Sequence, residues 1–328
     1  MRVLYRRAAV RVAAAAGAGM LAAGLTAAAG PARAEAAAAR VLAAGRGGAT
    51  VSGTWGTAQE IPGTAGLNAG GFAAVTSVSC ATAGNCSAAG YYVDSAGDQQ
   101  VFVVTQANGA WGTAVKVPGL TSLDNSGIPV VTSVSCGSAG NCSAGGSYQD
   151  GHGHRQVFVV AQANGIWGTA KEVPGTARLN AGGYATVNSV SCATAGNCSA
   201  GGNYQGGTTG EQAFVVTQTN GTWGKAEEVP GTATLNTGGN AAVNSVSCPS
   251  AGNCTAAGYY FGSGGGAFVV TQANGTWGTA QEIPGMASLA PNGGKITSVS
   301  CAAANRCSAG GQYGDSADNL QAFVVTES

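Results

Sequence analysis

Ten cysteines are the residues whose spacing most restricts the chemistry of this chain. They form five pairs with five residues between partners: Cys80/Cys86, Cys136/Cys142, Cys192/Cys198, Cys248/Cys254 and Cys301/Cys307. A metal site would need further ligands, but no histidine recurs with the pairs. Each pair flanks a tight turn, such as residues 81–85, so its two sulfurs can face each other across adjacent strands. We expect five disulfides formed in an oxidising compartment, with no metal and no cofactor.

The charged residues do not suggest a catalytic site. Four glutamates share one repeated position, Glu60, Glu172, Glu228 and Glu282, where another repeat has Lys116. Charge repeated along an outer strand prevents edge-to-edge pairing and indicates solvation. A glycosidase needs two central carboxylates, and the segments expected innermost (VTSVSC, VNSVSC and ITSVSC) contain none. A sialidase needs clustered arginines, and the repeats contain only Arg155, Arg178 and Arg306. The sequence predicts that the chain is not an enzyme.

The only histidines, His152 and His154, follow Asp150 in a glycine-rich loop of one repeat. A metal site is conceivable there, but its occurrence in a single repeat favours a solvated loop. The matching loops of two other repeats contain Asp94/Asp98 and Asp315/Asp318. Calcium would be possible in these loops, although their acid spacing differs from that of the His152 loop.

A repeat of about 56 residues must position these groups, since Trp55, Trp111, Trp167, Trp223 and Trp277 recur at spacings of 56, 56, 56 and 54. One unit predicts four strands, at residues 75–80, 86–93, 101–105 and 111–117. Asn108-Gly109 between the last two is a strong hairpin signal, and it returns in three further repeats. Pro118-Gly119 then ends the fourth strand.

The ends of the chain favour a ring over an open array. The repeats open with a lone fourth strand from Ser52 and finish with a lone third strand, residues 322–326. The strand numbers match only if the N-terminal strand completes the last blade, as in a closed propeller. The sequence therefore predicts an all-β, five-bladed β-propeller of four-stranded antiparallel blades.

The blade phrase SVSC-x5-C-S/T-A-x-G, followed by AFVVTQANGTWG, resembles the repeats of exported actinobacterial β-propeller proteins. It is also distantly similar to sialidase-type propellers with Asp-boxes and to tachylectin-like rings. The resemblance covers residues 52–328 and implies the blade, not a function. The Asp-box itself is absent, because Asn274-Gly275-Thr276-Trp277 keeps only the end of that motif.

The N-terminus has the pattern of an export signal. Four arginines precede an apolar run at residues 12–29, and Ala32-Arg33-Ala34 provides a cleavage pattern. We expect a signal peptide at 1–34, a flexible linker at 35–50 and the propeller at 51–328, whether the route is Sec or twin-arginine. The secreted chain would carry nine basic and 14 acidic residues, a formal net charge of −5. We expect neither a nucleic acid partner nor a membrane span after signal cleavage. We expect the protein to be a monomer.

One face of the propeller is predicted to carry binding. It holds the loops between second and third strands and the polar loops between blades. The candidate ligand-binding residues are Asn68, Gly70, Gly71, Asn180, Gly182, Gly183, Asn236, Gly238, Gly239, Asn292, Tyr92, Tyr148, Tyr204, Tyr260 and Tyr313. Amide and aromatic groups on long loops suit glycans or cell-surface polymers, bound at up to five similar sites. The alternatives are a propeller glycosidase or sialidase with an unrecognised site, and a structural or protein-interaction ring in which these residues form turns and pack between blades.

Overall fold

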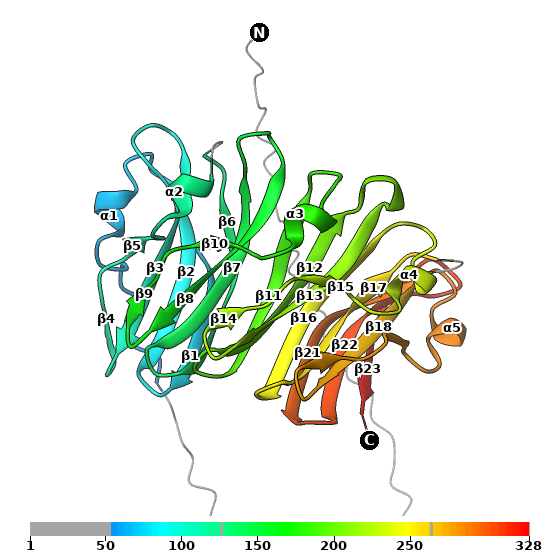
Figure 1. Cartoon of the computed structure of the whole chain (residues 1–328). Helices are drawn as coiled ribbons and strands as arrows, with labels where there is room; N and C mark the ends of the chain where they lie inside the picture. Colours follow the sequence, from blue (N-terminus) through cyan, green and yellow to red (C-terminus); the bar gives the residue numbers. More distant parts are fainter. Residues whose placement is uncertain (1–53, 125–126, 263–264, 328) are drawn as a thin grey trace, which may run out of the picture. The chain divides into compact units, whose positions relative to one another are not determined.

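The computed structural model describes residues 54–124, 127–262 and 265–327. The chain divides into residues 1–57 and 58–328, and all described strands and helices belong to the second unit. The strands form five successive antiparallel sheets (Figure 1), each of them one blade of the predicted all-β five-bladed propeller. The predicted signal peptide, the linker and residues 51–53 lie outside the described residues.

The blades repeat one strand order. Blade one contains β1 (Ala73–Thr82), β2 (Asn85–Val93), β3 (Gln99–Ala107), β4 (Ala110–Trp111) and β5 (Val115–Lys116). Blade two contains β6 (Val130–Ser138), β7 (Asn141–Gln149), β8 (Arg155–Ala163), β9 (Ile166–Trp167) and β10 (Lys171–Glu172). Blade three contains β11 (Ala185–Thr194), β12 (Asn197–Gln205), β13 (Glu211–Thr219), β14 (Thr222–Trp223) and β15 (Glu227–Glu228). Blade four contains β16 (Ala241–Ser250), β17 (Asn253–Tyr260), β18 (Gly266–Ala273), β19 (Thr276–Trp277) and β20 (Gln281–Glu282). Blade five contains β21 (Gly294–Ala303), β22 (Arg306–Gly314) and β23 (Leu320–Thr326).

The fourth strand of each blade is split into two short pieces, where the sequence predicted one continuous strand. The interruption has a physical cause, because the backbone between the pieces bonds to the preceding repeat. Ala170 N donates to Pro118 O at 2.7 Å, and Ala226 N donates to Pro174 O at 2.7 Å. The outer rim of one blade is thus joined to the rim of the next.

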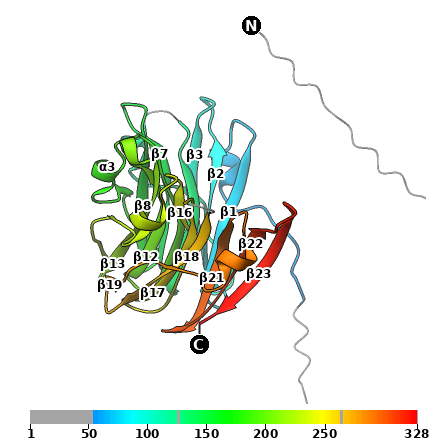
Figure 2. The ribbon, with the colours of Figure 1, turned by 90° about the vertical axis from the view of Figure 1, so that its right-hand side faces the viewer.

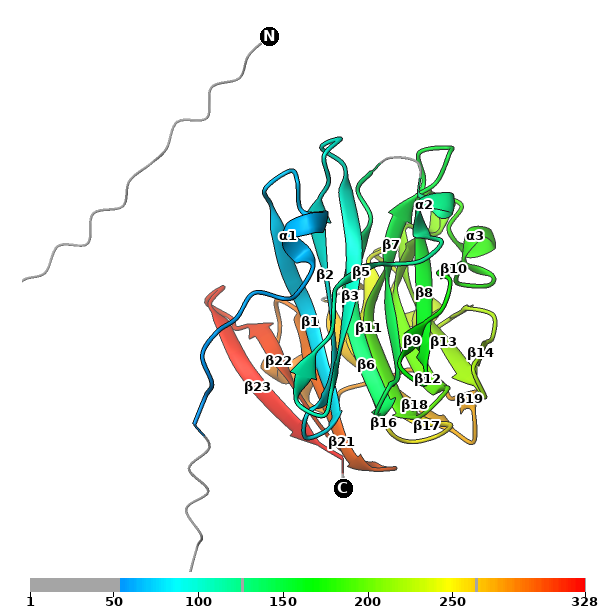
Figure 3. The same ribbon diagram turned by 90° about the vertical axis from the view of Figure 1, so that its left-hand side faces the viewer.

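A single helical turn follows each of β5, β10, β15 and β20, and another follows residues 54–61, in positions where the sequence predicted only loop. These turns are α1 (Thr64–Leu67), α2 (Leu120–Leu123), α3 (Thr176–Leu179), α4 (Thr232–Leu235) and α5 (Met286–Leu289). A glycine with positive φ precedes each turn, for example Gly63 at 87° and Gly175 at 89°. Figure 3 shows α1 beside β1 and β2, at the end of the blade where these turns lie.

The five predicted disulfides are confirmed. They join Cys80–Cys86, Cys136–Cys142, Cys192–Cys198, Cys248–Cys254 and Cys301–Cys307, each across the hairpin between the first and second strands. The Asn-Gly turns lie against these hairpins: Gly109 N donates to Gly84 O at 2.9 Å. Both residues of each such turn have positive φ, 49° at Asn108 and 85° at Gly109 in blade one. Five disulfides are typical of proteins in an oxidising compartment.

Successive blades are held together by repeated contacts along their innermost strands. The Ser77 hydroxyl of blade one accepts a hydrogen bond from Val134 N of blade two at 3.0 Å, and Ser133 accepts one from Val190 N at 3.0 Å. Apolar side chains fill the space between blades, including Phe102, Phe158, Phe214 and Phe268, all at most 1% exposed. Each pair of neighbouring blades therefore shares one core.

Closure of the ring by the N-terminal strand stays a prediction. Blade five has three strands, and Figure 2 shows β23 at the edge of its sheet. Residues 54–61 contain no strand. On blade one, Val78 is 60% exposed, whereas its counterpart Val134 in blade two is 5% exposed.

Among the described residues, no helix has the length and apolar character needed to cross a membrane.

One junction between blades lacks a hydrogen bond that its neighbours have. The indole Nε1 of Trp167 donates to Thr105 Oγ1 at 3.2 Å, and Trp277 Nε1 donates to Thr217 Oγ1 at 3.2 Å. Blade two has Ala161 at the position of these threonines, and the buried Nε1 of Trp223 has no partner. The threonine hydroxyl is therefore the group that satisfies this buried donor.

Replacing Ala161 with threonine should raise the free energy of unfolding by about 1 kcal/mol, the usual value of one such hydrogen bond. Ala161→Val is the matched control, since it adds similar volume without the hydroxyl. Denaturant unfolding of the three proteins would check this, and an equal gain in both variants would assign the effect to packing.

Candidate functional site

The two ends of the blades differ in character. The disulfide hairpins lie at one end, whereas the loops between second and third strands and the helical turns lie at the other, which we call the loop face (Figure 1). All of the predicted ligand-binding residues belong to segments at the loop face. Their side chains are not equally available there.

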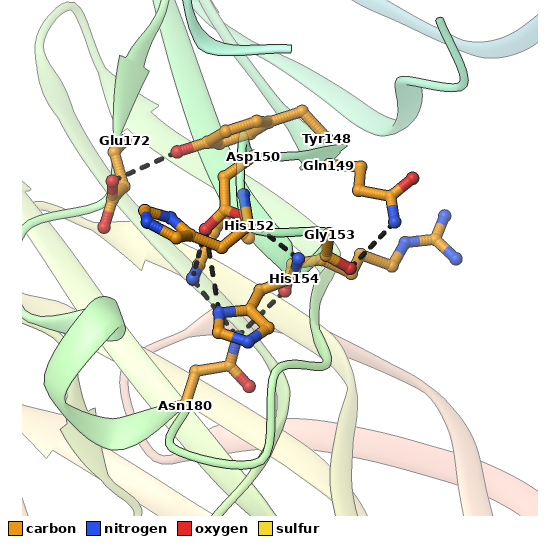
Figure 4. Close-up of polar contacts among 10 residues, drawn as sticks. Tyr148, Gln149, Asp150, His152, Gly153, His154, Glu172 and Asn180 are labelled. Atoms are coloured by element: carbon orange, nitrogen blue, oxygen red, sulfur yellow. Dashed lines mark hydrogen bonds and ion pairs between the residues drawn. The ribbon is translucent and has the colours of Figure 1, made fainter. Parts of the chain in front are cut away.

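The predicted tyrosines are mostly structural. Tyr92, Tyr148 and Tyr204 are 3% exposed, and Tyr260 is 7% exposed. The hydroxyl of Tyr148 donates to Glu172 at 3.0 Å (Figure 4), Tyr204 donates to Glu228 at 2.9 Å, and Tyr260 donates to Glu282. Burial, together with the Glu172 carboxylate, raises the pKa of Tyr148. Three of the repeated glutamates, Glu172, Glu228 and Glu282, therefore accept hydrogen bonds from buried tyrosine hydroxyls, whereas the sequence predicted them only as solvating charges.

The predicted asparagines and glycines hold the loops in shape. Asn180 and Asn236 are 3% and 4% exposed. The side-chain amide of Asn180 donates to Arg155 O at 2.9 Å, and that of Asn236 donates to Glu211 O at 2.8 Å. Asn292 donates to Asp315 O at 2.8 Å, while Asn68 accepts a bond from Phe72 N at 2.8 Å.

The glycines of these loops close turns against the second strand. Gly70, Gly182 and Gly238 donate their N–H groups to the end of that strand, at 2.9, 2.8 and 2.6 Å. The next glycines, Gly71, Gly183 and Gly239, have φ of 80°, 77° and 68°. A ligand-binding role for these asparagine-glycine loops stays a prediction, and their observed contacts are those of turn formers.

Three aspartates have the same loop-forming role. One oxygen of Asp150 accepts bonds from His152 N at 2.8 Å and His154 N at 3.0 Å (Figure 4). These bonds lower the pKa of Asp150, although its partial burial acts in the opposite direction. Asp94 and Asp315 hold their own loops in the same way.

The histidine loop shows no metal geometry. The rings of His152 and His154 stack with centroids 6.2 Å apart, and His154 Nδ1 lies 3.9 Å from Asp150. In the described residues, no three His, Cys, Asp or Glu side chains form a metal-binding group.

The repeats differ from one another mainly at the loop face. One cross-strand pair is nearly constant: Val75–Gly90, Val131–Gly146, Val187–Gly202, Val243–Gly258 and Ile296–Gly311. The next pair toward the loop face varies: Ala74–Tyr91, Val130–Ser147, Thr186–Asn203, Ala242–Tyr259 and Lys295–Gln312. Five equivalent binding sites would need the same residues in each blade. Because the pair nearer the loop face differs between blades, a single asymmetric binding site is favoured.

A groove of about 340 Å³ lies where blades four and five meet at the loop face. We call it the loop-face groove, and its side chains include Asn240, Tyr259, Phe261, Lys295, Gln312 and Leu320. The rings of Tyr259 and Phe261 meet edge to face, with centroids 6.0 Å apart. The hydroxyl of Tyr259 donates to Asn240 Oδ1 at 3.1 Å, which fixes the orientation of this ring. The predicted residues Tyr260, Asn292 and Tyr313 also line the groove.

A carboxyl group lies beside this groove. Glu211 starts β13, and its backbone N–H donates to Gly239 O at 2.7 Å, next to Asn240. Burial raises the pKa of Glu211, which favours its protonated form. Burial, with the nearby charge of Glu211, also raises the pKa of Tyr259. An acid of this kind can donate a proton at higher pH than an exposed carboxyl group.

A second aromatic group lies between blades two and three. The guanidinium carbon of Arg155 lies 5.5 Å from the ring centroid of Tyr184, and Arg155 Nε donates to Ser147 Oγ at 2.8 Å. Tyr184 is 45% exposed and contributes to the raised pKa of Tyr259. Aromatic and charged side chains at the loop face are therefore found beyond the groove, at Tyr184 and Arg155.

The sequence contained a signal for these residues. Lys295 and Glu211 each depart from what the other repeats have at the same position, and Tyr259 shares its residue type only with Tyr91 of blade one. Gln99 and Arg155 hold the position of Glu211 in blades one and two. A comparison of the repeats position by position would have separated these residues from the constant asparagines and tyrosines.

No protein-family model matches the chain, and no curated protein matches it. Solved structures do match at low identity. A Hadza microbial sialidase has 11% identity and a TM-score of 0.48, over 77% of this chain and 56% of the sialidase. A GH43_1 enzyme from Xanthomonas citri has 12% identity and a TM-score of 0.36, over 77% and 87%. The catalytic domain of a Coprinopsis cinerea GH62 alpha-L-arabinofuranosidase has 11% identity and a TM-score of 0.35, over 77% and 92%.

The prediction that the chain is not an enzyme is contradicted by these findings, because the similar structures include a sialidase and glycoside hydrolases. The position of Glu211 also shows that an acid can lie beside the groove without belonging to an innermost strand. The innermost strands contain no acid, but β13 places a carboxyl group with a raised pKa beside the loop-face groove.

Proposed function

We propose that the loop-face groove binds a carbohydrate. The observation that carries the proposal is the edge-to-face pair of Tyr259 and Phe261 in a groove that also presents amide and ammonium groups. Aromatic rings give a sugar a flat apolar surface, while Asn240, Lys295 and Gln312 can bond its hydroxyls. A volume of about 340 Å³ lies within the range of small-ligand sites.

The protein is proposed to act outside the cell. Its five disulfides and the sequence pattern of an export signal both support that location. Binding through one groove, rather than through five loops, implies that affinity does not depend on multivalency.

Removing the ring of Tyr259 should lower the affinity of the groove for its glycan at least tenfold, or about 1.4 kcal/mol. The matched control is Tyr91→Ala, which removes a tyrosine from the same position of blade one. A glycan array would identify the ligand, and calorimetry would compare wild type, Tyr259→Ala and Tyr91→Ala. Equal affinities for all three proteins would place the site elsewhere.

Hydrolysis of the bound glycan is a second candidate function, favoured by the raised pKa of Glu211. Glu211→Gln keeps the size of the side chain and removes the acid. If Glu211 protonates a leaving group, this variant should bind the glycan with unchanged affinity and cleave it at least 100-fold more slowly. Product analysis by chromatography would detect cleavage, and cleavage at the wild-type rate would exclude Glu211 as the acid.

A further inference from the structure

A second pocket adjoins the loop-face groove at blade four. We call it the blade-four pocket; its volume is about 360 Å³, and Tyr260, Gly265 and Gly266 line both it and the groove. Its other wall includes Met286, the first residue of α5, a turn that lies beside β18 (Figure 1). Because the two glycines place no side chain between the spaces, one ligand can extend from the groove into the pocket.

The blade-four pocket lies where other blades have a pair of buried amide side chains. In blades two and three, a glutamine at the start of the third strand accepts a hydrogen bond from an asparagine that follows the helical turn. These pairs are Gln156 with Asn180, at 3.1 Å, and Gln212 with Asn236, at 2.9 Å. Blade four has Gly266 and Ala290 at the two positions. Both members of the pair are therefore lost together, and both replacements line the pocket.

Two further residues at this junction differ from the other repeats. Met286 starts α5, whereas the turns of the two preceding repeats start with Thr176 and Thr232. A Cβ atom at Gly294 would lie 2.4 Å from Met286 Cε, so the glycine makes room for the methionine. Methionine is flexible enough to move aside for a bound group. Four changes thus meet beside the groove, in a framework that is otherwise nearly constant.

One backbone acceptor beside the pocket has lost its usual donor. In blade three, the side-chain amide of Asn236 donates to Glu211 O at 2.8 Å. Gly265 holds the position of Glu211 in blade four, but Ala290 has no amide to donate. A donor on a ligand can take the place of this amide at the carbonyl of Gly265.

The remaining walls of the pocket are mostly apolar. Ile283, Met286 and Ala290 are buried, as is Tyr260. Glu282, an acid of the lining, already accepts the hydrogen bond of the Tyr260 hydroxyl. A sugar ring in this pocket would lose water from several hydroxyls without finding partners for them, which costs free energy. An aromatic ring with one hydroxyl matches the apolar walls and the single acceptor.

We propose that the blade-four pocket receives an aromatic aglycone of the glycan, an assignment that rests on the proposed binding of the sugar in the groove. The ring packs against Ile283 and Met286, and its hydroxyl donates to Gly265 O. The sugar stays in the groove with Tyr259 and Phe261. The ligand is thus an aryl glycoside, in which a sugar is joined to a phenol.

NMR of the Met286 methyl group tests this proposal. The chain has three methionines, and Met286 is the only one beyond residue 34. The full chain, labelled with ¹³C at the methionine methyl groups, is titrated with phenol and with the 4-hydroxyphenyl and methyl β-glycosides of glucose, galactose and xylose. Met286→Leu assigns the signal. Phenol and at least one aryl glycoside should shift it, and that glycoside should bind about tenfold more tightly than its methyl counterpart. A Met286 signal that no aryl glycoside moves overturns the proposal.

Two variants should close the pocket and abolish the response of Met286 to phenol. The double variant Gly266→Gln with Ala290→Asn restores the amide pair of blades two and three. Because a Cβ atom at residue 266 would lie 2.6 Å from the Tyr260 hydroxyl, Ala290→Leu fills the pocket from its other side without this contact. Ser288→Leu is the matched control, an exposed position of α5 outside the lining, and should keep the response. An unchanged response in both pocket-filling variants contradicts the proposal.

Tyr259→Ala separates this assignment from the proposed function. It should weaken the binding of methyl and aryl glycosides alike and leave the phenol response of Met286 unchanged. Glycosides that bind the groove without any aryl effect on Met286 would overturn the aglycone assignment alone. Glycosides whose affinity ignores Tyr259→Ala would instead overturn the proposed function.

Discussion

Replacing Gly146 with alanine should destabilise the protein by about 3 kcal/mol or more, because no space exists for a Cβ atom at this position. A Cβ there would lie 1.9 Å from the carbonyl oxygen of Val130, a backbone atom that cannot turn away. A bulge between Val131 and Ser133 brings this carbonyl over the glycine. The same contact recurs at Gly90, Gly202, Gly258 and Gly311, where the distances are 2.1, 1.9, 1.8 and 1.9 Å.

Gly145→Ala is the matched control, one residue away in the same strand. Its Cβ would meet only the methyl groups of Val187 and Val190, at 3.0 Å, and blades one and four already have Ala89 and Ala257 at this position. Denaturant unfolding or circular dichroism would compare the two variants. A similar, small loss of stability in both would show that the first strand can move, and that the bulge does not fix its path.

The elements predicted well were those set by local chemistry. Asparagine and glycine both accept positive φ, so Asn108-Gly109 predicts a two-residue hairpin turn in which both central residues have positive φ. Cys80 and Cys86 flank a tight turn, so their sulfurs face each other across adjacent strands. Because the same signals return in each repeat, a strand or turn assigned in one blade applies to the other blades as well. The blade could therefore be derived from the sequence with little error.

The candidate site could not be derived in the same way, because it depends on which residues meet across blades. Tyr148 and Glu172 are 24 residues apart in the sequence. Only the fold shows that the buried hydroxyl of Tyr148 donates to the carboxylate of Glu172. The absence of acids from the innermost strands does not reveal Glu211, because Glu211 starts a third strand. The asparagines recur because each of them holds its own loop in shape, so their repetition reflects the framework of the blades.

Asn236→Ala should lower the free energy of unfolding by about 3 kcal/mol, although the sequence predicted Asn236 as a candidate ligand-binding residue. The amide of Asn236 donates to Glu211 O and to Gln212 Oε1, at 2.8 and 2.9 Å, and its oxygen accepts a bond from Asn240 N at 2.8 Å. Alanine would leave these buried groups without partners. Thermal unfolding measures the loss.

Asn180→Ala is the matched control that separates the framework from the site. Its amide makes the same two bonds, to Arg155 O and Gln156 Oε1, at 2.9 and 3.1 Å, but its Oδ1 is buried without a partner, so a smaller loss of stability than in Asn236→Ala is expected. Only Asn236 also positions Asn240, which orients Tyr259 in the loop-face groove. Glycan affinity, measured well below both melting temperatures, should therefore fall in Asn236→Ala and persist in Asn180→Ala. If both variants lost affinity while keeping their stability, the repeated loops would be the binding sites and the groove would not.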